Sequence, residues 1–171
     1  RTLKFASTIT RPANTTQYAV GDVIANVTSN DPFVLGQNNL VGYEKRVTRG
    51  NTHTGTINKL LLHSSANQST KPGVRLFIFP EAVTEVADNG AFAPTDAEMA
   101  KLICTVDMLP EDWVTGNTTS GAGGNSVCQA LNIDVPFRCA GGALYIVPVL
   151  TNTYTPVSGE IFTLDAVITA D

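Results

Sequence analysis

Charged side chains are scarce in this sequence. They make up 15% of the 171 residues, against about 25% in typical soluble domains, and Thr, Asn, Ser and Gly take their place. Short uncharged polar residues suit sheets and turns, whereas solvent-exposed helices usually rely on Glu, Lys and Arg. The shortage of charge therefore argues against a mainly helical protein.

The sequence also lacks a basic surplus and a long apolar run. The formal net charge is −4, so we expect no broad basic face for nucleic acid. No run approaches the roughly 20 apolar residues that a membrane helix needs. The first residues, Arg1 to Ile9, alternate and do not form the core of a signal peptide. Neither a nucleic-acid partner nor a membrane partner is expected.

Cysteines are few, namely Cys104, Cys128 and Cys139. Their odd number, wide spacing and lack of a CxxC pair encode neither a zinc site nor a redox motif. We therefore expect no metal and no other cofactor. Three buried free thiols fit a reducing compartment such as a bacterial cytoplasm. A bridge between Cys128 and Cys139 is the alternative if the two lie side by side.

Aromatic residues make up only 7% of the chain, with a single tryptophan, Trp113. A carbohydrate-binding module usually displays several exposed rings, so the composition does not favour one. We expect Trp113 to be a core anchor. An anchor in a protein interface is the alternative, because tryptophan is enriched at binding hot spots.

No catalytic pattern stands out. His63 precedes Ser64 directly, but neighbours in a strand point to opposite faces, so the pair is no triad. A Gly-x-Ser-x-Gly elbow is absent from the sequence. Glu81, Glu85 and Asp88 are interpreted as solvated loop charges, with a glycosidase acid–base pair or a Ca²⁺ site as the alternative. We expect the protein not to be an enzyme.

What the sequence does contain is strand periodicity. Apolar and polar residues alternate through 3–9, 131–137 and 160–169, as in half-buried strands. Thr56–Ser64 and Val74–Phe79 hold more continuous apolar runs, which predicts a central pair of strands covered on both faces.

Turn residues separate further strand candidates. Gly141-Gly142 predicts a hairpin turn, after which 143–150 runs back as a strand whose Pro148 favours an edge or a bulge. Residues 115–126 are interpreted as an exposed loop, and 40–48 as a weaker strand.

One helix is predicted near residues 95–102, because Thr95 and Glu98 have the spacing of a capping box. Eight or nine strands and one short helix predict an all-β fold. We expect an antiparallel β-sandwich of jelly-roll type, as a single domain over residues 1–171.

Four stretches resemble a family of small virion proteins of tailed bacteriophages. They are TITRPANTTQYAVGDVI (8–24), GVRLFIF (73–79), ADNGAFAPTDAEMAK (87–101) and YTPVSGEIFTL (154–164). Some members are capsid decoration (cement) proteins with a jelly-roll fold. The resemblance implies a homo-oligomer, a dimer or trimer, that is assembled in the host cytoplasm. In the virion it would bind the outside of the head and bridge major capsid subunits. It transfers no functional residue.

Contact with the capsid is expected from basic residues near the N-terminus and in one cluster. The five candidates are Arg1, Lys4, Lys45, Arg46 and Arg49. The cluster at 45–49 is alternatively a solvated strand edge, since basic residues there discourage strand pairing. For the whole chain, a tail, baseplate or receptor-binding protein is one alternative. A secreted carbohydrate-binding module or a hydrolase on the same scaffold is another.

Overall fold

The structure is a computed structural model that describes residues 2–36, 53–117 and 119–170. Within these ranges the chain is mostly β-strand, as predicted. The strands are β1 (Thr2–Thr10), β2 (Phe33–Leu35), β3 (His53–Ser64), β4 (Val74–Phe79), β5 (Cys104–Met108), β6 (Val114–Asn117), β7 (Asn125–Cys139), β8 (Leu144–Leu150) and β9 (Ile161–Ala170). A single helical turn, α1 (Asp96–Met99), and a 3-10 turn at Pro110–Asp112 complete the elements.

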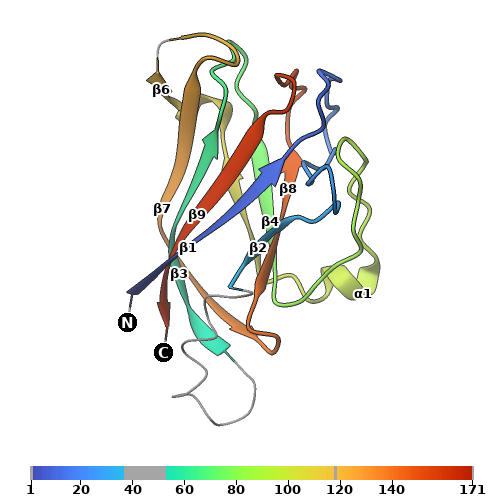
Figure 1. The fold of residues 1–171 in the computed structure, drawn as a ribbon. Coiled ribbons are helices and arrows are strands. Elements are labelled where there is room, and N and C mark those ends of the chain that lie inside the picture. Colours follow the sequence, from blue (N-terminus) through green and yellow to red (C-terminus); the bar gives the residue numbers. More distant parts are fainter. Residues whose placement is uncertain (1, 37–52, 118, 171) are drawn as a thin grey trace.

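Two antiparallel sheets pack face to face, as Figure 1 shows. One has the strand order β1-β9-β3-β7-β6, and the other has the order β2-β8-β4-β5. If β6 is left out, the strands pair from the two ends of the chain inward. β1 pairs with β9, β2 with β8, β3 with β7, and β4 with β5. This is the pairing of a jelly roll, so the predicted fold class is confirmed.

The main core lies between the sheets. Along β9 the side chains of Phe162, Leu164, Ala166 and Ile168 are buried and alternate with more exposed residues, so the predicted alternation is confirmed. β1 behaves likewise. Trp113 is buried in the same core, and its indole N–H donates to the Pro72 carbonyl at 2.7 Å. The prediction of a core anchor is confirmed.

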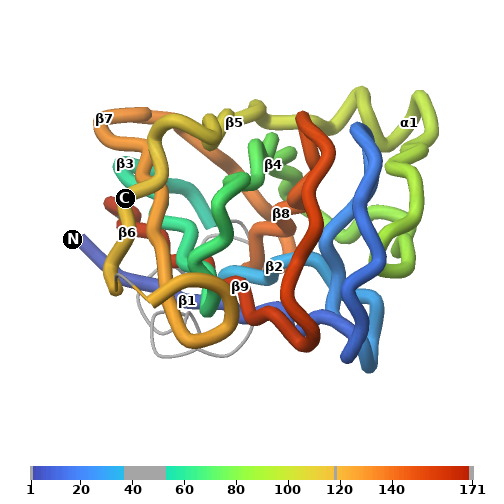
Figure 2. The backbone as a smooth tube through the Cα atoms, turned by 90° about the horizontal axis from the view of Figure 1, so that it is seen from above, coloured from blue at the N-terminus to red at the C-terminus, as the bar shows by residue number. Residues whose placement is uncertain are grey.

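A second apolar cluster covers the outer face of the β2-β8-β4-β5 sheet. Val23, Phe79 and Val147 are buried there. The rings of Phe77 and Phe92 meet at a centroid distance of 4.9 Å. The chain between β4 and β5, which contains α1, supplies much of this cover and lies across the molecule from β3, β6 and β7 (Figure 2). Both faces of β4 and β8 are therefore covered.

The predicted central pair is wrong in one respect. β3 and β4 belong to different sheets and do not pair, because the chain between them crosses from one sheet to the other. Double coverage is confirmed for β4 but not for β3, where Leu61 and His63 are only half-buried.

β7 departs from the predicted alternation at Leu131. The register between β3 and β7 shifts here, and residues 132–134 lie opposite the single residue Asn58. Asn132 and Asp134 adopt left-handed backbone with φ of 53° and 43°. Such a bulge reverses which face a strand residue occupies. Leu131 is therefore 50% exposed on the outer face, while Val135 packs against the core.

Two predictions about turns and loops need correction. Gly142 does adopt left-handed backbone in a turn, but β7 and β8 belong to different sheets, so the turn closes no hairpin. The predicted loop at 115–126 holds most of β6 and the start of β7. The predicted strand at 40–48 lies outside the described residues.

Pro148 lies inside β8, which pairs on both sides, yet its missing N–H interrupts no ladder. β2 pairs only with residues 144–146. Beyond β2, Ile24 donates to the Pro148 carbonyl at 3.0 Å. In a strand the N–H and C=O of one residue point the same way. The absent donor therefore faces the side on which β2 has already ended.

α1 begins as predicted and ends early. Thr95 and Glu98 form the complete capping box. The helix stops at Met99 because Leu102 joins the second apolar cluster and Ile103 donates to the Ile78 carbonyl of β4.

Candidate functional site

The predicted contact residues are only partly placed by the structure. Lys4 is exposed on β1, and its Nζ lies 3.2 Å from Asp165 Oδ2 of β9. Arg1, Lys45, Arg46 and Arg49 lie outside the described residues. The structure therefore does not bring the five candidates together.

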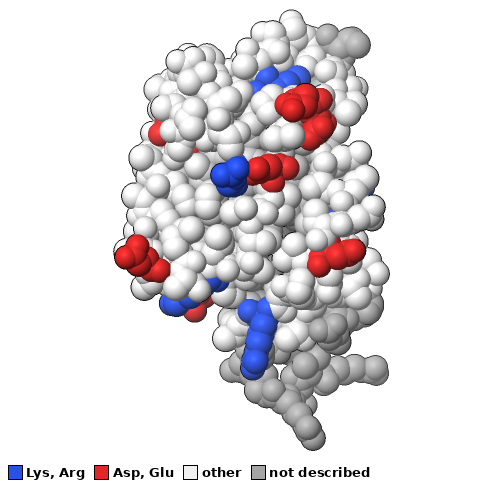
Figure 3. Space-filling model, turned by 180° about the vertical axis from the view of Figure 1, so that it is seen from behind, with Lys and Arg blue, Asp and Glu red and all other residues white. Residues whose placement is uncertain are grey.

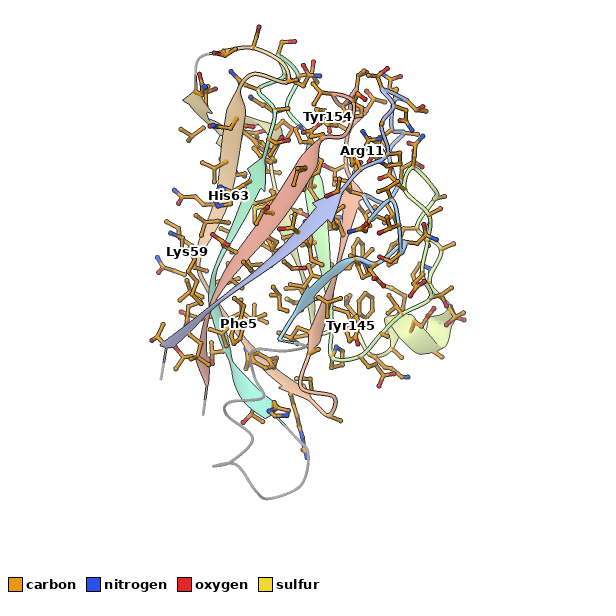
Figure 4. The ribbon with its side chains drawn as sticks, in the orientation of Figure 1. Phe5, Arg11, Lys59, His63, Tyr145 and Tyr154 are labelled. Atoms are coloured by element: carbon orange, nitrogen blue, oxygen red, sulfur yellow. The ribbon has the colours of Figure 1, made fainter. Side chains whose placement is uncertain are left out.

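Lys4 belongs to the outer sheet face, by which we mean the solvent-facing side of β1, β9, β3, β7 and β6. His63 also points to this face, with its Nε2 3.4 Å from Asp165 Oδ2 and its side chain 43% exposed. Figure 4 shows His63 and Lys59 directed away from the core. Ser64 points inward and is buried, so the expectation that His63 and Ser64 diverge is confirmed.

Apolar side chains interrupt the polar ones on this face. Val114 is 60% exposed and Leu131 50% exposed. Half-buried Val127 lies directly opposite Val114, and half-buried Val167 lies in the same row as Leu131 with Lys59 between them. Half-buried Leu61 lies in the row between these two, opposite Gln129. Exposed apolar residues grouped in this way are typical of a protein-binding surface.

Charge is scarce elsewhere as well. On the opposite side of the molecule, charged side chains occur singly or in small groups on a mostly uncharged surface (Figure 3). Such a surface cannot attract a strongly charged partner over distance.

A buried polar network braces one end of the sandwich. The Arg11 side chain is fully buried, and its Nη2 lies 3.1 Å from Asp88 Oδ2. Arg11 Nε donates to the Tyr18 hydroxyl, which donates to Asp88 Oδ1 at 2.5 Å. Ala25 N donates to the same carboxylate oxygen at 3.1 Å. Burial is the main cause that raises the pKa of Tyr18.

The interpretation of Asp88 as a solvated loop charge is therefore wrong. Its side chain is only 5% exposed and is paired with Arg11. Glu81 pairs instead with Lys101 on the surface, and Glu85 is exposed. The acidic cluster is split, so the glycosidase pair and the Ca²⁺ site have no geometry to support them.

A second buried carboxylate extends the network. Glu160 accepts from Ser64 Oγ at 2.5 Å, from the Tyr154 hydroxyl at 2.8 and 2.9 Å, and from Val157 N at 3.2 Å. Burial raises the pKa of Glu160 above its usual range. The Tyr18 N–H donates to the Tyr154 carbonyl at 2.9 Å, which joins the two halves. Arg11 and Tyr154 lie at the same end of the molecule in Figure 4.

This network was not found in the sequence. Its members come from five separate segments, and only the fold brings them together. The one local signal is position, since Arg11 directly follows β1 and Glu160 directly precedes β9. Because the carboxylates are buried and bonded within the protein, the network serves to hold loops in place.

A polar cleft lies next to the network, because residues beside Tyr18 and Tyr154 in the sequence line it. It has a volume of about 330 Å³ and is lined by Gln17, Gln68, Ser69, Thr70, Thr153 and Thr155. Gln17 Nε2 donates to Thr155 Oγ1 at 3.2 Å, and Gln68 Nε2 donates to the Thr155 carbonyl at 3.1 Å. No charged side chain or aromatic ring is among these described lining residues. The cleft offers hydroxyls and amides that suit a small neutral polar ligand.

The three cysteines are free thiols. Cys128 and Cys139 are buried and Cys104 is half-buried, so the alternative of a Cys128–Cys139 bridge is not realised. Burial raises the pKa of all three thiols, and that of Cys128 to about 11. Thiols with raised pKa values are poor nucleophiles.

The described residues hold no group of three His, Cys, Asp or Glu side chains that could bind a metal ion. None of their helices is long and apolar enough to cross a membrane.

Comparison with known proteins adds no family. The chain matches no family model, and no curated protein matches it.

Proposed function

We propose that the chain is a structural protein of a tailed-phage virion that decorates the outside of the head and bridges major capsid subunits. One observation carries the proposal. The stretches that resemble phage head proteins lie on a fold with jelly-roll strand pairing, an architecture that viral capsid domains use repeatedly.

The outer sheet face is the surface we assign to the head. Its exposed Leu131 and Val114 give apolar contact. Each single contact is expected to be modest. A homo-oligomer that touches several capsid subunits at once would gain avidity from their number.

Cryo-electron microscopy of virions of the phage that encodes this chain tests the proposal. We expect density for the sandwich on the outer head surface, with β7 turned towards the shell. A head without this density, from virions that contain the chain, contradicts the proposal.

A binding assay with heads that lack the protein adds a matched comparison. Leu131→Asp changes the outer sheet face and is expected to weaken co-sedimentation with heads about tenfold. Met99→Asp changes an exposed apolar residue of α1 and is expected to leave binding unchanged. Equal binding by both variants contradicts the assignment of this face.

The polar cleft favours one second candidate, a tail or receptor-binding protein that recognises a neutral saccharide. Antibody labelling of the tail instead of the head, together with glycan binding that Thr155→Ala abolishes, would support this candidate over decoration.

A further inference from the structure

β1 is an edge strand whose pairing leaves one side open. Arg11 N donates to the Glu160 carbonyl at 3.0 Å, whereas the Thr10 carbonyl accepts from Val27 N on the other side. Backbone direction alternates along a strand. The odd residues of β1 therefore bond to β9, and the even residues Thr2, Lys4, Ala6 and Thr8 direct their N–H and C=O groups away from it.

Within the described part of the chain, the backbone groups of these four residues bond to nothing on the open side. Such a row is a template for another strand. Edge strands are usually protected by prolines, bulges or free lysines. β1 has no proline, and its register with β9 is continuous over nine pairs, so it has no bulge. Its single lysine, Lys4, forms an ion pair with Asp165.

We propose that β1 pairs antiparallel with β1 of a second copy of this chain, about a two-fold axis that passes beside Phe5. In this register Thr2 lies opposite Thr8 of the partner subunit, and Lys4 lies opposite the partner's Ala6. All four open residues of each copy then find a partner, which gives about eight backbone hydrogen bonds across the interface.

The neighbouring symmetric registers are less favourable. A two-fold axis at Lys4 would place the two lysines directly opposite each other, and like charges in that position are destabilising. An axis at Ala6 would pair Thr2 with Thr10 of the partner subunit. The carbonyl of Thr10 is already occupied by Val27.

Charge complementarity supports the chosen register. Ala6 lies opposite Asp165 of β9 within one copy. In the dimer, Lys4 of the partner subunit lies on the other side of Ala6, so lysine, alanine and aspartate form one row across three strands. The small Ala6 leaves room for the lysine to reach over about 10 Å of two strand spacings. Asp165 then faces a lysine from each copy.

The inference specifies the oligomer within the proposed function and rests on it only for its biological role. Pairing at β1 would join the two five-stranded sheets into one and double the outer sheet face.

Analytical ultracentrifugation of the purified chain tests the dimer. We expect the wild-type chain to be dimeric at about 100 µM. Ala6→Pro removes only an N–H that points to the open side, so the bonds to β9 remain and Pro is tolerated at an edge. We expect this variant to be monomeric with unchanged circular dichroism, and Ala6→Ser to stay dimeric. A monomeric wild type, or a dimeric and folded Ala6→Pro, overturns the proposal.

A charge cycle tests the register independently of proline. Ala6→Lys places a lysine opposite Lys4 of the partner subunit, and we expect it to raise the dimer Kd at least about tenfold. Adding Lys4→Glu to Ala6→Lys restores an alternating row of charges and should restore the dimer. Failure of this rescue overturns the register. A monomer that still decorates heads contradicts only this inference, whereas a dimer absent from heads contradicts only the proposed function.

Discussion

Arg11 and Asp88 form an ion pair in a place where neither residue could remain charged alone. Both side chains are almost completely buried, and removing two charges from water costs several kcal/mol for each ion. The hydroxyl of Tyr18 and the backbone N–H of Ala25 also donate to Asp88, whereas Nη1 of Arg11 is buried without a hydrogen-bond partner. The pair thus fixes the loops around Tyr18 and Asp88 relative to the end of β1.

Asp88→Asn tests this pair. The substitution keeps the shape of the side chain but leaves the buried Arg11 charge without its ion-pair partner. We expect the free energy of unfolding, measured by urea denaturation, to fall by about 3 kcal/mol.

Glu81→Gln is the control, because the pair of Glu81 with Lys101 is half-exposed. Pairs of this kind contribute no more than about 1 kcal/mol. If Asp88→Asn costs no more than Glu81→Gln, the buried pair does not hold the loops.

At the residue scale, the sequence predicted what is local. Thr95 and Glu98 were found because a capping box needs only a spacing of three residues. Asp88 was misread because its partner Arg11 lies 77 positions away. The residues next to Arg11 and Asp88 in the sequence give no sign that the two side chains pair.

At the scale of elements, Glu98 ties α1 to the chain that precedes it. Its carboxylate accepts from Thr95 N at 2.7 Å and from Thr84 N at 2.5 Å, as well as from both threonine hydroxyls. These hydrogen bonds lower the pKa of Glu98 to about 2.

The lowered pKa of Glu98 predicts a pH-dependent opening of this segment. A carboxyl group with a depressed folded-state pKa stabilises above its unfolded value and loses this effect as the pH falls through the folded value. The amide signals of Thr84 and Thr95 should therefore stay constant in NMR spectra down to about pH 4 and shift with a midpoint near 2. Glu98→Gln should remove this transition, and a midpoint near 4.5 would contradict the four hydrogen bonds.

Strand prediction succeeded where the strand is regular. β1 and β9 keep their alternation throughout, so their buried faces could be read from the sequence. β7 could not, because the bulge opposite Asn58 turns Leu131 to the outside. Left-handed Asn132 and Asp134 mark it, but Asn and Asp are common signals in a chain rich in turns.

At the scale of the whole molecule, packing of the sandwich keeps two of the three thiols away from solvent. We expect Cys128 and Cys139 to react slowly with a disulfide reagent at pH 8, because both are buried and their pKa values are raised. Half-buried Cys104 should react first. All three should react at once in denaturant, as counted by mass spectrometry, and rapid native labelling of Cys128 would contradict the packing.

The class of fold was predictable because strand count, turns and alternation all agree. The strand order was not, since neighbours in sequence such as β3 and β4 lie in different sheets. The contact residues were chosen as a terminal segment and a basic stretch, because terminal arms and sheet edges can dock a partner. Lys4 is the only one of the five within the described residues. Exposed Leu131 was missed because a bulge turns it to the outer sheet face.

The pairing of the first strand with the last also sets when this protein can fold. Thr8 and Thr163 share a hydrogen bond across 155 positions of sequence, so β1 leaves the ribosome long before β9 exists. Proteins whose contacts are mostly non-local fold in milliseconds to seconds, whereas proteins with mostly local contacts fold in microseconds to milliseconds. Until β9 emerges, nascent β1 has neither of its edges satisfied, and a strand with a single charge and no proline or glycine is then exposed to pairing with other unfinished chains.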